Sequence, residues 1–201
     1  MNALISRRAA LAGGLACFAR PALADPPSWG AQLVDAARAQ VGVTTIYDPA
    51  YARIAYPGGD VARQRGVCTD VVIRAYRDAF GLDLQRQVHE DMLRHFDAYT
   101  HRYGLGAPDG NIDHRRVPNL QAFFRRKGAQ LAIAADPAAH REGDLVTVTL
   151  PGNLDHIMIV AGAEEGVRPL VIHNIGGGAQ LEDRLFEFPH TGHFRYAPDA
   201  A

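Results

Sequence analysis

The chain has 201 residues, with 21 Lys and Arg, 22 Asp and Glu, and a formal net charge of −1. A nucleic-acid-binding protein needs an excess of basic residues on one face. The near-equal numbers of basic and acidic residues here do not indicate nucleic-acid binding. The length and the 47% share of hydrophobic residues are those of one ordinary domain with a sizeable core.

The first 24 residues have the three parts of a secretory signal. Ser6-Arg7-Arg8 is positively charged, Ala9–Ala19 is apolar, and Ala22-Leu23-Ala24 is a cleavage site. The apolar stretch is shorter than the roughly 18 residues of a membrane span. We therefore expect a signal peptide over 1–24 and a single domain over 25–201. The domain would be periplasmic or secreted, with no membrane span after cleavage, by either the general or the twin-arginine route.

The first half of the remaining chain has helical patterns and the second half has strand patterns. Helices are predicted over Trp29–Val41, Cys68–Phe80, Glu90–Tyr99 and from Val117 to a stop at Gly128. Strands are predicted over Asp144–Leu150, His156–Ala161, Leu170–Asn174, Leu185–Phe188 and His193–Tyr196. This order indicates an α+β fold in which helices pack on one face of an antiparallel sheet.

Cys68 is the candidate nucleophile. The other cysteine, Cys17, lies in the predicted signal, so the exported domain would carry one unpaired thiol at the N-terminus of a helix. Backbone N–H groups there favour the thiolate and can stabilise an oxyanion. Asp70 opposes ionisation and either serves the helix dipole or points toward substrate. The alternative is a small, buried, inert side chain.

His156 and His173 are the candidate base and orienting group. A turn centred on Glu164-Glu165 places them directly opposite each other on adjacent strands, with Cβ atoms roughly 4.5–5.5 Å apart. Asn174 is the alternative orienting residue. It would point to the other face, unless a bulge in the turn reverses the choice. A Cys on a helix followed by a His and a polar residue on strands is the papain-type order.

A metal site is the competing interpretation of the histidines. His89-Glu90 lacks the second His that a zinc-helix motif requires at the position of Leu93. Asp113-His114 gives no familiar ligand spacing either. We therefore expect no metal and no cofactor.

Several segments carry a resemblance to a known family. Glu142-Gly143-Asp144-Leu145-Val146 and Asp155–Val160 resemble the strand pair of the NlpC-type cysteine peptidases, and Gly66–Asp70 resembles their nucleophile position. More specific segments resemble a bacterial domain-of-unknown-function family within that superfamily, over nearly the whole mature chain: Val67–Ala75, Val88–Met92, Asn111–Leu120 and Ile172–Gly176.

The resemblance implies a papain-like, NlpC-like fold and hydrolysis of amide bonds, typically in cell-wall peptides. It carries over Cys68 as nucleophile, His156 as base and His173 as the third polar residue. It also implies an upstream Tyr near the oxyanion site, for which Tyr56 is the nearest match. The segment from Leu84 to Arg116 is longer than usual in that superfamily, so its polar side chains are either substrate contacts or a solvated loop: His89, Glu90, Asp113, His114 and Arg115.

Together these observations predict a cysteine hydrolase that cleaves an amide or peptide bond in peptidoglycan through a thioester. The expected partner is peptidoglycan or a peptide. Two alternatives stay open: a non-catalytic module that binds cell-wall peptides, and a secreted amidase toxin. The sequence does not choose the bond, the export route or the oligomeric state.

Overall fold

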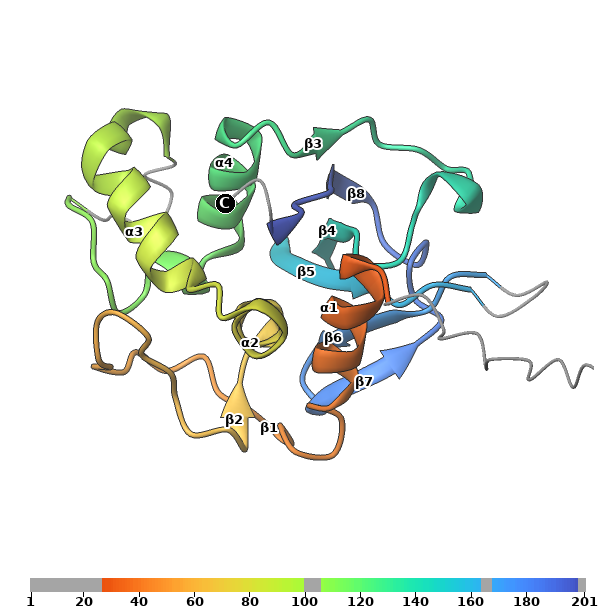
Figure 1. Cartoon of the computed structure of the whole chain (residues 1–201), viewed down its shortest axis with the longest axis horizontal. Helices are drawn as coiled ribbons and strands as arrows, with labels where there is room; N and C mark the ends of the chain where they lie inside the picture. The colour runs from red at the N-terminus through yellow and green to blue at the C-terminus, as the bar shows by residue number, and fades with distance from the viewer. Residues whose placement is uncertain (1–26, 100–105, 164–167, 199–201) are drawn as a thin grey trace, which may run out of the picture.

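The computed structural model of the protein describes residues 27–99, 106–163 and 168–198. The predicted signal sequence therefore lies outside the described residues. The fold is α+β (Figure 1), and the described residues hold four α-helices, all before the long strands of the sheet: α1 (Trp29–Arg38), α2 (Cys68–Phe80), α3 (Leu84–His95) and α4 (Val117–Arg126). The described residues also form three short 3₁₀ turns, two between α3 and α4 and one between β3 and β4: η1 (Phe96–Ala98), η2 (Asp113–Arg115) and η3 (Pro137–Ala139).

The described strands form a six-stranded antiparallel sheet and a small two-stranded parallel pair. The sheet has the order β3-β8-β4-β5-β6-β7. Its strands are β3 (Gln130–Leu131), β4 (Leu145–Leu150), β5 (Leu154–Val160), β6 (Val171–Asn174), β7 (Ala179–Glu182) and β8 (His190–Phe194). The parallel pair joins β1 (Ile46–Tyr47) to β2 (Arg65–Gly66), directly before α2.

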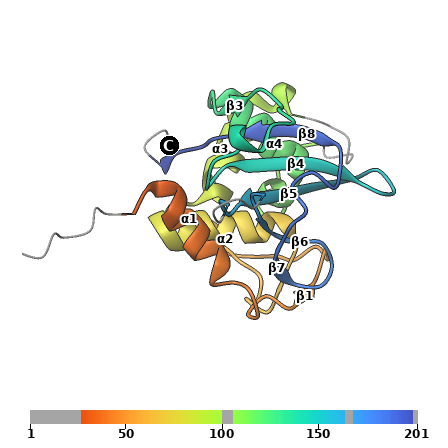
Figure 2. The ribbon, with the colours of Figure 1, turned by 90° about the vertical axis from the view of Figure 1, so that its right-hand side faces the viewer.

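The two faces of the sheet carry different clusters. Ile157, Ile159 and Ile172 face the helices and belong to the main core. Met158 and Val171, with their neighbours, face the other way into a smaller cluster. α1 and α2 lie beside each other against β5 and β6, and α3 lies farthest from the sheet (Figures 1 and 2). The central helix α2 is therefore enclosed between the sheet and the other helices.

Capping chemistry explains why α2 and α4 begin and end where the sequence predicts. Gly81 follows α2 with φ of 65°, and Gly128 follows α4 with φ of 70°, a backbone conformation that favours glycine. Pro118 lies in the first turn of α4, where its missing N–H costs no hydrogen bond. The prediction that Leu120 and the two following phenylalanines point inward is confirmed.

Two of the predicted helices have wrong boundaries. α3 begins at Leu84 rather than Glu90, because the Asp83 side chain accepts a hydrogen bond from the Gln85 N–H and caps an earlier start. It ends at His95 and continues as the 3₁₀ turn η1. α1 ends at Arg38, three residues before the predicted Val41, because the chain there tightens into turns.

The predicted strand at Leu185–Phe188 is also wrong. These residues form a turn whose apolar side chains pack into the smaller cluster beside the sheet. An apolar run shows that a segment is buried, but it does not distinguish a strand from a packed turn. The strand in this part of the chain is β7, an edge strand of mixed polarity that no apolar run marks.

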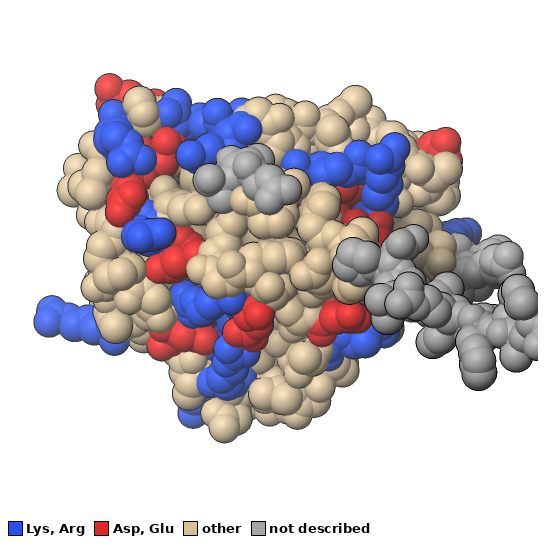
Figure 3. All heavy atoms as spheres, viewed as in Figure 1, with Lys and Arg blue, Asp and Glu red and all other residues tan. Residues whose placement is uncertain are grey.

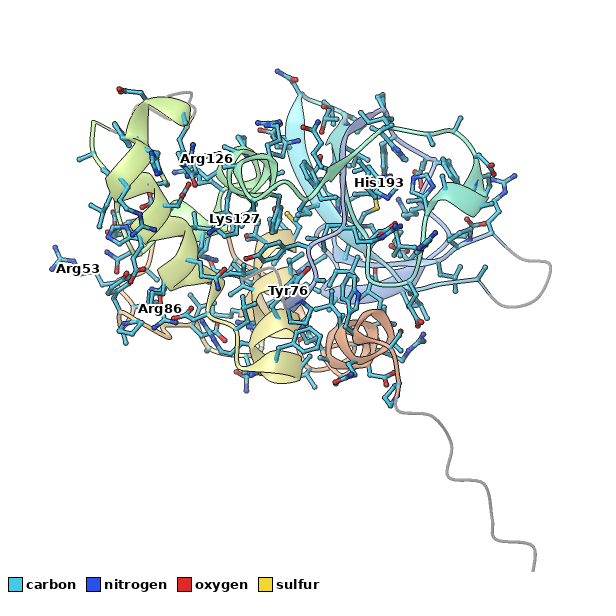
Figure 4. The ribbon with its side chains drawn as sticks, turned by 45° about the horizontal axis from the view of Figure 1, so that its top comes forward. Arg53, Tyr76, Arg86, Arg126, Lys127 and His193 are labelled. Carbon is cyan, nitrogen blue, oxygen red and sulfur yellow. The ribbon has the colours of Figure 1, made fainter. Side chains whose placement is uncertain are left out.

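Arg74 of α2 holds the chain segment that precedes α2 against this helix. Its side chain is fully buried, and it donates to both carboxylate oxygens of Asp60 and to the carbonyl oxygens of Val61, Arg63 and Arg65. Each of these bonds holds the loop that leads into Cys68. Two residues after Arg74, Tyr76 points into the interior of the molecule (Figure 4) and donates to the Tyr196 carbonyl.

No helix among the described residues is long and apolar enough to cross a membrane. On the face in Figure 3, basic and acidic side chains lie interspersed. Some surface cations are paired, such as Arg63 with Asp78 and Arg65 with Asp48. Others, such as Arg53, project away from the body of the protein (Figure 4).

Replacing Arg74 by Met should lower the free energy of unfolding by about 3–5 kcal/mol, because it leaves Asp60 without its buried partner. Arg63→Met at the exposed pair with Asp78 is the matched control and should change it by less than about 1 kcal/mol. Urea unfolding of both variants measures the difference. Equal losses would show that Arg74 does not hold this loop.

Candidate active site

The start of α2 is fixed by a buried carboxylate. Asp70 Oδ2 accepts a hydrogen bond of 2.7 Å from the Val67 N–H, directly before Cys68. Arg115 Nε and Nη2 donate to the two oxygens of Asp70, both at 2.9 Å. Asp70 is only 3% exposed and fully engaged, so it does not point toward substrate. Of its two predicted roles, the structure supports the one at the helix terminus.

Arg115 also reaches the segment that follows β1. Its Nη1 donates to the Ala50 carbonyl at 3.2 Å and its Nη2 to the Asp48 carbonyl at 3.1 Å. The Thr69 hydroxyl donates in turn to the Arg115 carbonyl at 3.2 Å. Arg115 was a candidate substrate contact, but its side chain instead joins three segments of the chain around Cys68.

Cys68 lies where β5 and β6 separate. Their pairing joins Val160 to Val171 and Ile159 to Ile172, and the ladder ends there. The next hydrogen-bonded pair would join Ile157 to Asn174. Instead, the Ile157 N–H hydrogen-bonds the sulfur of Cys68. The sulfur thus takes the place of a missing strand partner, directly beside the residue that follows His156.

Asn174 holds the other side of this opening. Its Nδ2 donates to the Gly66 carbonyl at 3.0 Å, and its Oδ1 accepts from the Gly176 N–H at 3.1 Å. The side chain therefore ties β6 to the residue pair before Cys68. As the sequence predicts, Asn174 points away from the two imidazoles.

The expectation of a readily ionised thiol is wrong for the resting structure. Cys68 is 5% exposed, and burial raises its pKa to about 11, with Asp70 adding to the rise. The N–H groups of Ile157, Thr69 and Cys68 lower the pKa, but they do not outweigh the loss of water around the sulfur. At neutral pH, Cys68 is a thiol.

Cys68 nevertheless lines an open pocket with a volume of about 170 Å³. Neither His156 nor His173 lines it. The other walls come from β1 and the segment after it, from the residue before α2, from η2 and its flanking residues, and from the starts of α4 and β5: Tyr47, Pro49, Val67, Ile112, Arg115, Arg116, Val117 and Asp155.

The predicted contact between the two imidazoles is confirmed, but the predicted register is wrong. His156 Nε2 lies 2.7 Å from His173 Nδ1, with ring centroids 5.0 Å apart. The observed ladder would place His173 opposite Met158, so the two rings meet diagonally. A slip of two residues keeps the side chains on the same face, which is why the contact survives it. The predicted turn lies partly outside the described residues.

Both imidazoles are buried and uncharged at neutral pH. His156 is 2% exposed, and burial together with the neighbouring His173 lowers its pKa to about 3. Burial also lowers the pKa of His173, opposed by a hydrogen bond from its Nε2 to Glu182 Oε2 at 2.9 Å. The sequence analysis did not identify Glu182. The alternation of β7, which places it on the same face as His173, would have marked it.

The tyrosine of the pocket is Tyr47, not the predicted Tyr56. Tyr56 is 46% exposed, and its ring packs edge-on against His89 at a centroid distance of 5.1 Å. Tyr47 lines the Cys68 pocket instead. Tyr47 is still 39% exposed, but its partial burial raises its pKa to about 12, so its hydroxyl remains a hydrogen-bond donor. The pairing of β1 with β2 brings Tyr47 to the pocket, and no local sequence motif predicts this position.

The remaining candidates lie on α3 and η2, away from the Cys68 pocket. His89 Nδ1 lies 2.8 Å from Asp113 Oδ2, and that carboxylate is fully buried. His114 is 2% exposed, and burial, with the charge of Arg115, lowers its pKa to about 3. None of these, nor Glu90, lines the Cys68 pocket. The contact between His89 and Asp113 links α3 to the chain before α4.

In the described part of the chain, no group of three or more His, Cys, Asp or Glu side chains is arranged to hold a metal ion.

The fold and site define a small α+β protein with a buried thiol at a helix N-terminus and a hydrogen-bonded imidazole pair on two strands of the sheet. Residues 34–196 match the family described as "Domain of unknown function (DUF1287)", and the chain belongs to this family. It is 50% identical over 166 residues to "Uncharacterized protein YijF" of Escherichia coli (strain K12), covering 82% of this chain and 80% of that protein.

A solved structure, "Structure of NlpC1 from Trichomonas vaginalis", is similar with a TM-score of 0.46 and 12% identity. The similarity covers 87% of this chain and 46% of that one, so the chain spans about half the length of that protein.

The buried neutral histidines make stability depend on pH. A His with a folded pKa of about 3 and an unfolded pKa of about 6.5 stabilises the fold above pH 6.5. This contribution is lost as the pH falls toward 3, by about 1.4 kcal/mol per pH unit for each such His. Removing the titrating group with His114→Gln should reduce the slope of unfolding free energy against pH by about this amount between pH 6 and 4. Urea unfolding measures the slope, and an unchanged slope would contradict the burial of a neutral His114.

Proposed function

We propose that this protein is an exported cysteine hydrolase that cleaves an amide bond in peptidoglycan peptides, within a papain-like, NlpC-like fold. The observation that supports it best is the placement of the Cys68 sulfur. The sulfur is hydrogen-bonded to the backbone of Ile157, which follows His156. The His156 ring is hydrogen-bonded to His173. The sequence resemblance supports the same assignment of nucleophile, base and orienting residue.

The reaction begins from two neutral groups. His156 Nε2 is occupied by His173, so Nδ1 is the nitrogen available to the thiol. It accepts the Cys68 proton as the sulfur attacks the substrate carbonyl carbon, which gives a tetrahedral oxyanion and an imidazolium. The N–H groups of the first turn of α2, with the Tyr47 hydroxyl in the same pocket, donate to the oxyanion.

Collapse of this intermediate breaks the carbon–nitrogen bond and forms a thioester on Cys68. The imidazolium of His156 gives its proton to the leaving amine. Neutral His156 then takes a proton from water, the water oxygen attacks the thioester, and the acid product leaves as the thiol is restored. No external oxidant or cofactor is needed. His173 holds the base in place throughout.

A second function is a non-catalytic module that binds cell-wall peptides in the same pocket. The observation that favours it is the burial of Cys68, whose raised pKa is typical of an unreactive structural cysteine. The secreted-toxin alternative shares the chemistry of the hydrolase and differs only in its target.

Purified sacculi incubated with wild type, Cys68→Ser and Cys68→Ala distinguish these functions. The hydrolase releases new peptide products, read by mass spectrometry, and both variants lose at least about a thousandfold of this activity because the nucleophile is gone. Cys68→Ser is the matched control, since it keeps the size of the side chain.

A binding module would sediment with sacculi equally well in all three forms and release nothing. Equal product formation by all three forms would show that Cys68 is not the nucleophile. Lysis of cells on export of wild type, but not of Cys68→Ser, would favour the toxin.

A further inference from the structure

Three side chains form a diagonal row on one face of adjacent strands: His156 on β5, His173 on β6 and Glu182 on β7. His156 Nε2 lies 2.7 Å from His173 Nδ1, and His173 Nε2 lies 2.9 Å from Glu182 Oε2. His173 is paired with Gln180 in the ladder, so Glu182 also reaches it diagonally. The row starts one residue before Ile157, whose backbone bonds the Cys68 sulfur, and it ends at the edge strand β7.

The chemistry of the last member fixes the protons of the other two. An ionised carboxylate only accepts hydrogen bonds, so His173 must carry its proton on Nε2. A neutral imidazole has one N–H, which leaves His173 Nδ1 as an acceptor. The bond between the rings then requires the proton of His156 to be on Nε2. The lone pair of His156 is therefore on Nδ1.

We propose that Glu182 is a positioning residue that acts through His173 to set the tautomer of His156, so that Nδ1 can accept the Cys68 proton. This inference rests on the proposed function and extends it by one residue. Glu182 touches neither substrate nor sulfur. Without it, the ring pair can reverse its protons, and His156 would then present an N–H on Nδ1, which cannot act as a base.

The surroundings of His173 favour this arrangement. Its ring is 1% exposed, so water does not compete for its nitrogens. Besides His156 and Glu182, the charged groups that act on it are Arg184 and Glu187. Arg184 lies 3.2 Å from Glu182 Oε2 and 3.3 Å from Glu187 Oε1, so it holds the ionised Glu182 carboxylate at the edge of the sheet.

The test compares Glu182→Met, which keeps the side-chain length but cannot accept a hydrogen bond, with Glu187→Met. The control removes a neighbouring carboxylate that does not touch His173. Long-range ¹H–¹⁵N NMR spectra of the rings report which nitrogen carries each proton. Wild type and Glu187→Met should show both histidines protonated on Nε2 alone, whereas Glu182→Met should show protonation at Nδ1 as well.

The digestion of sacculi gives the functional readout. Loss of a carboxylate that touches the base directly costs about 10⁴-fold in a serine protease triad. Because His173 intervenes here, we expect about a 10- to 100-fold fall in kcat/KM for Glu182→Met and less than about twofold for Glu187→Met. Glu182 also raises the pKa of His173, so its loss should move the acid limb of the pH profile to lower pH.

The spectra decide the inference without any turnover. A wild-type His156 protonated on Nδ1, or a ring pair whose protons are unchanged in Glu182→Met, overturns the role of Glu182. If the spectra agree but no form digests sacculi, the tautomer assignment stands and the proposed substrate fails.

Discussion

The buried ion pair between Asp70 and Arg115 is the constraint on which the site depends. The carboxylate caps the N-terminus of α2, and the guanidinium holds the carboxylate while it binds two carbonyls of the segment after β1. Each charge is paired and hydrogen-bonded, so loss of either partner leaves the other buried and uncompensated. The position of Cys68 is therefore set by long-range contacts, and not only by the helix that it begins.

The same burial determines the chemistry that the site can perform. A helix N-terminus favours a thiolate, but the loss of water around the Cys68 sulfur has the larger effect, and the thiol stays protonated. His156 is neutral for the same reason. The proposed reaction consequently starts without charge separation, and an ion pair forms only as the thiol proton moves. An acceptor nitrogen facing the thiol is then essential, which is why the proton order along β5, β6 and β7 matters.

The sequence could predict those features that depend on helix capping and on the alternation of side chains along a strand. The bounds of α2 follow from Cys68 and Gly81. The contact between the two histidines was predicted correctly despite a wrong register, because a shift of two residues keeps a side chain on the same face of the sheet. The apolar run Leu185–Phe188 was wrongly predicted to be a strand, because burial alone does not define a strand. The burial of the thiol, the place of Tyr47 in the pocket and the engagement of Arg115 depend on segments far apart in the chain. They require the fold.

The most direct test of the central claim is the rate at which iodoacetamide alkylates Cys68 at neutral pH, in wild type and in His156→Ala. With a thiol pKa of about 11, little thiolate is present, so fast alkylation requires that the proton pass to His156. The account predicts a rate at least about tenfold higher in wild type than in the variant. Equal rates, with the same dependence on pH, would show that His156 does not act on the sulfur.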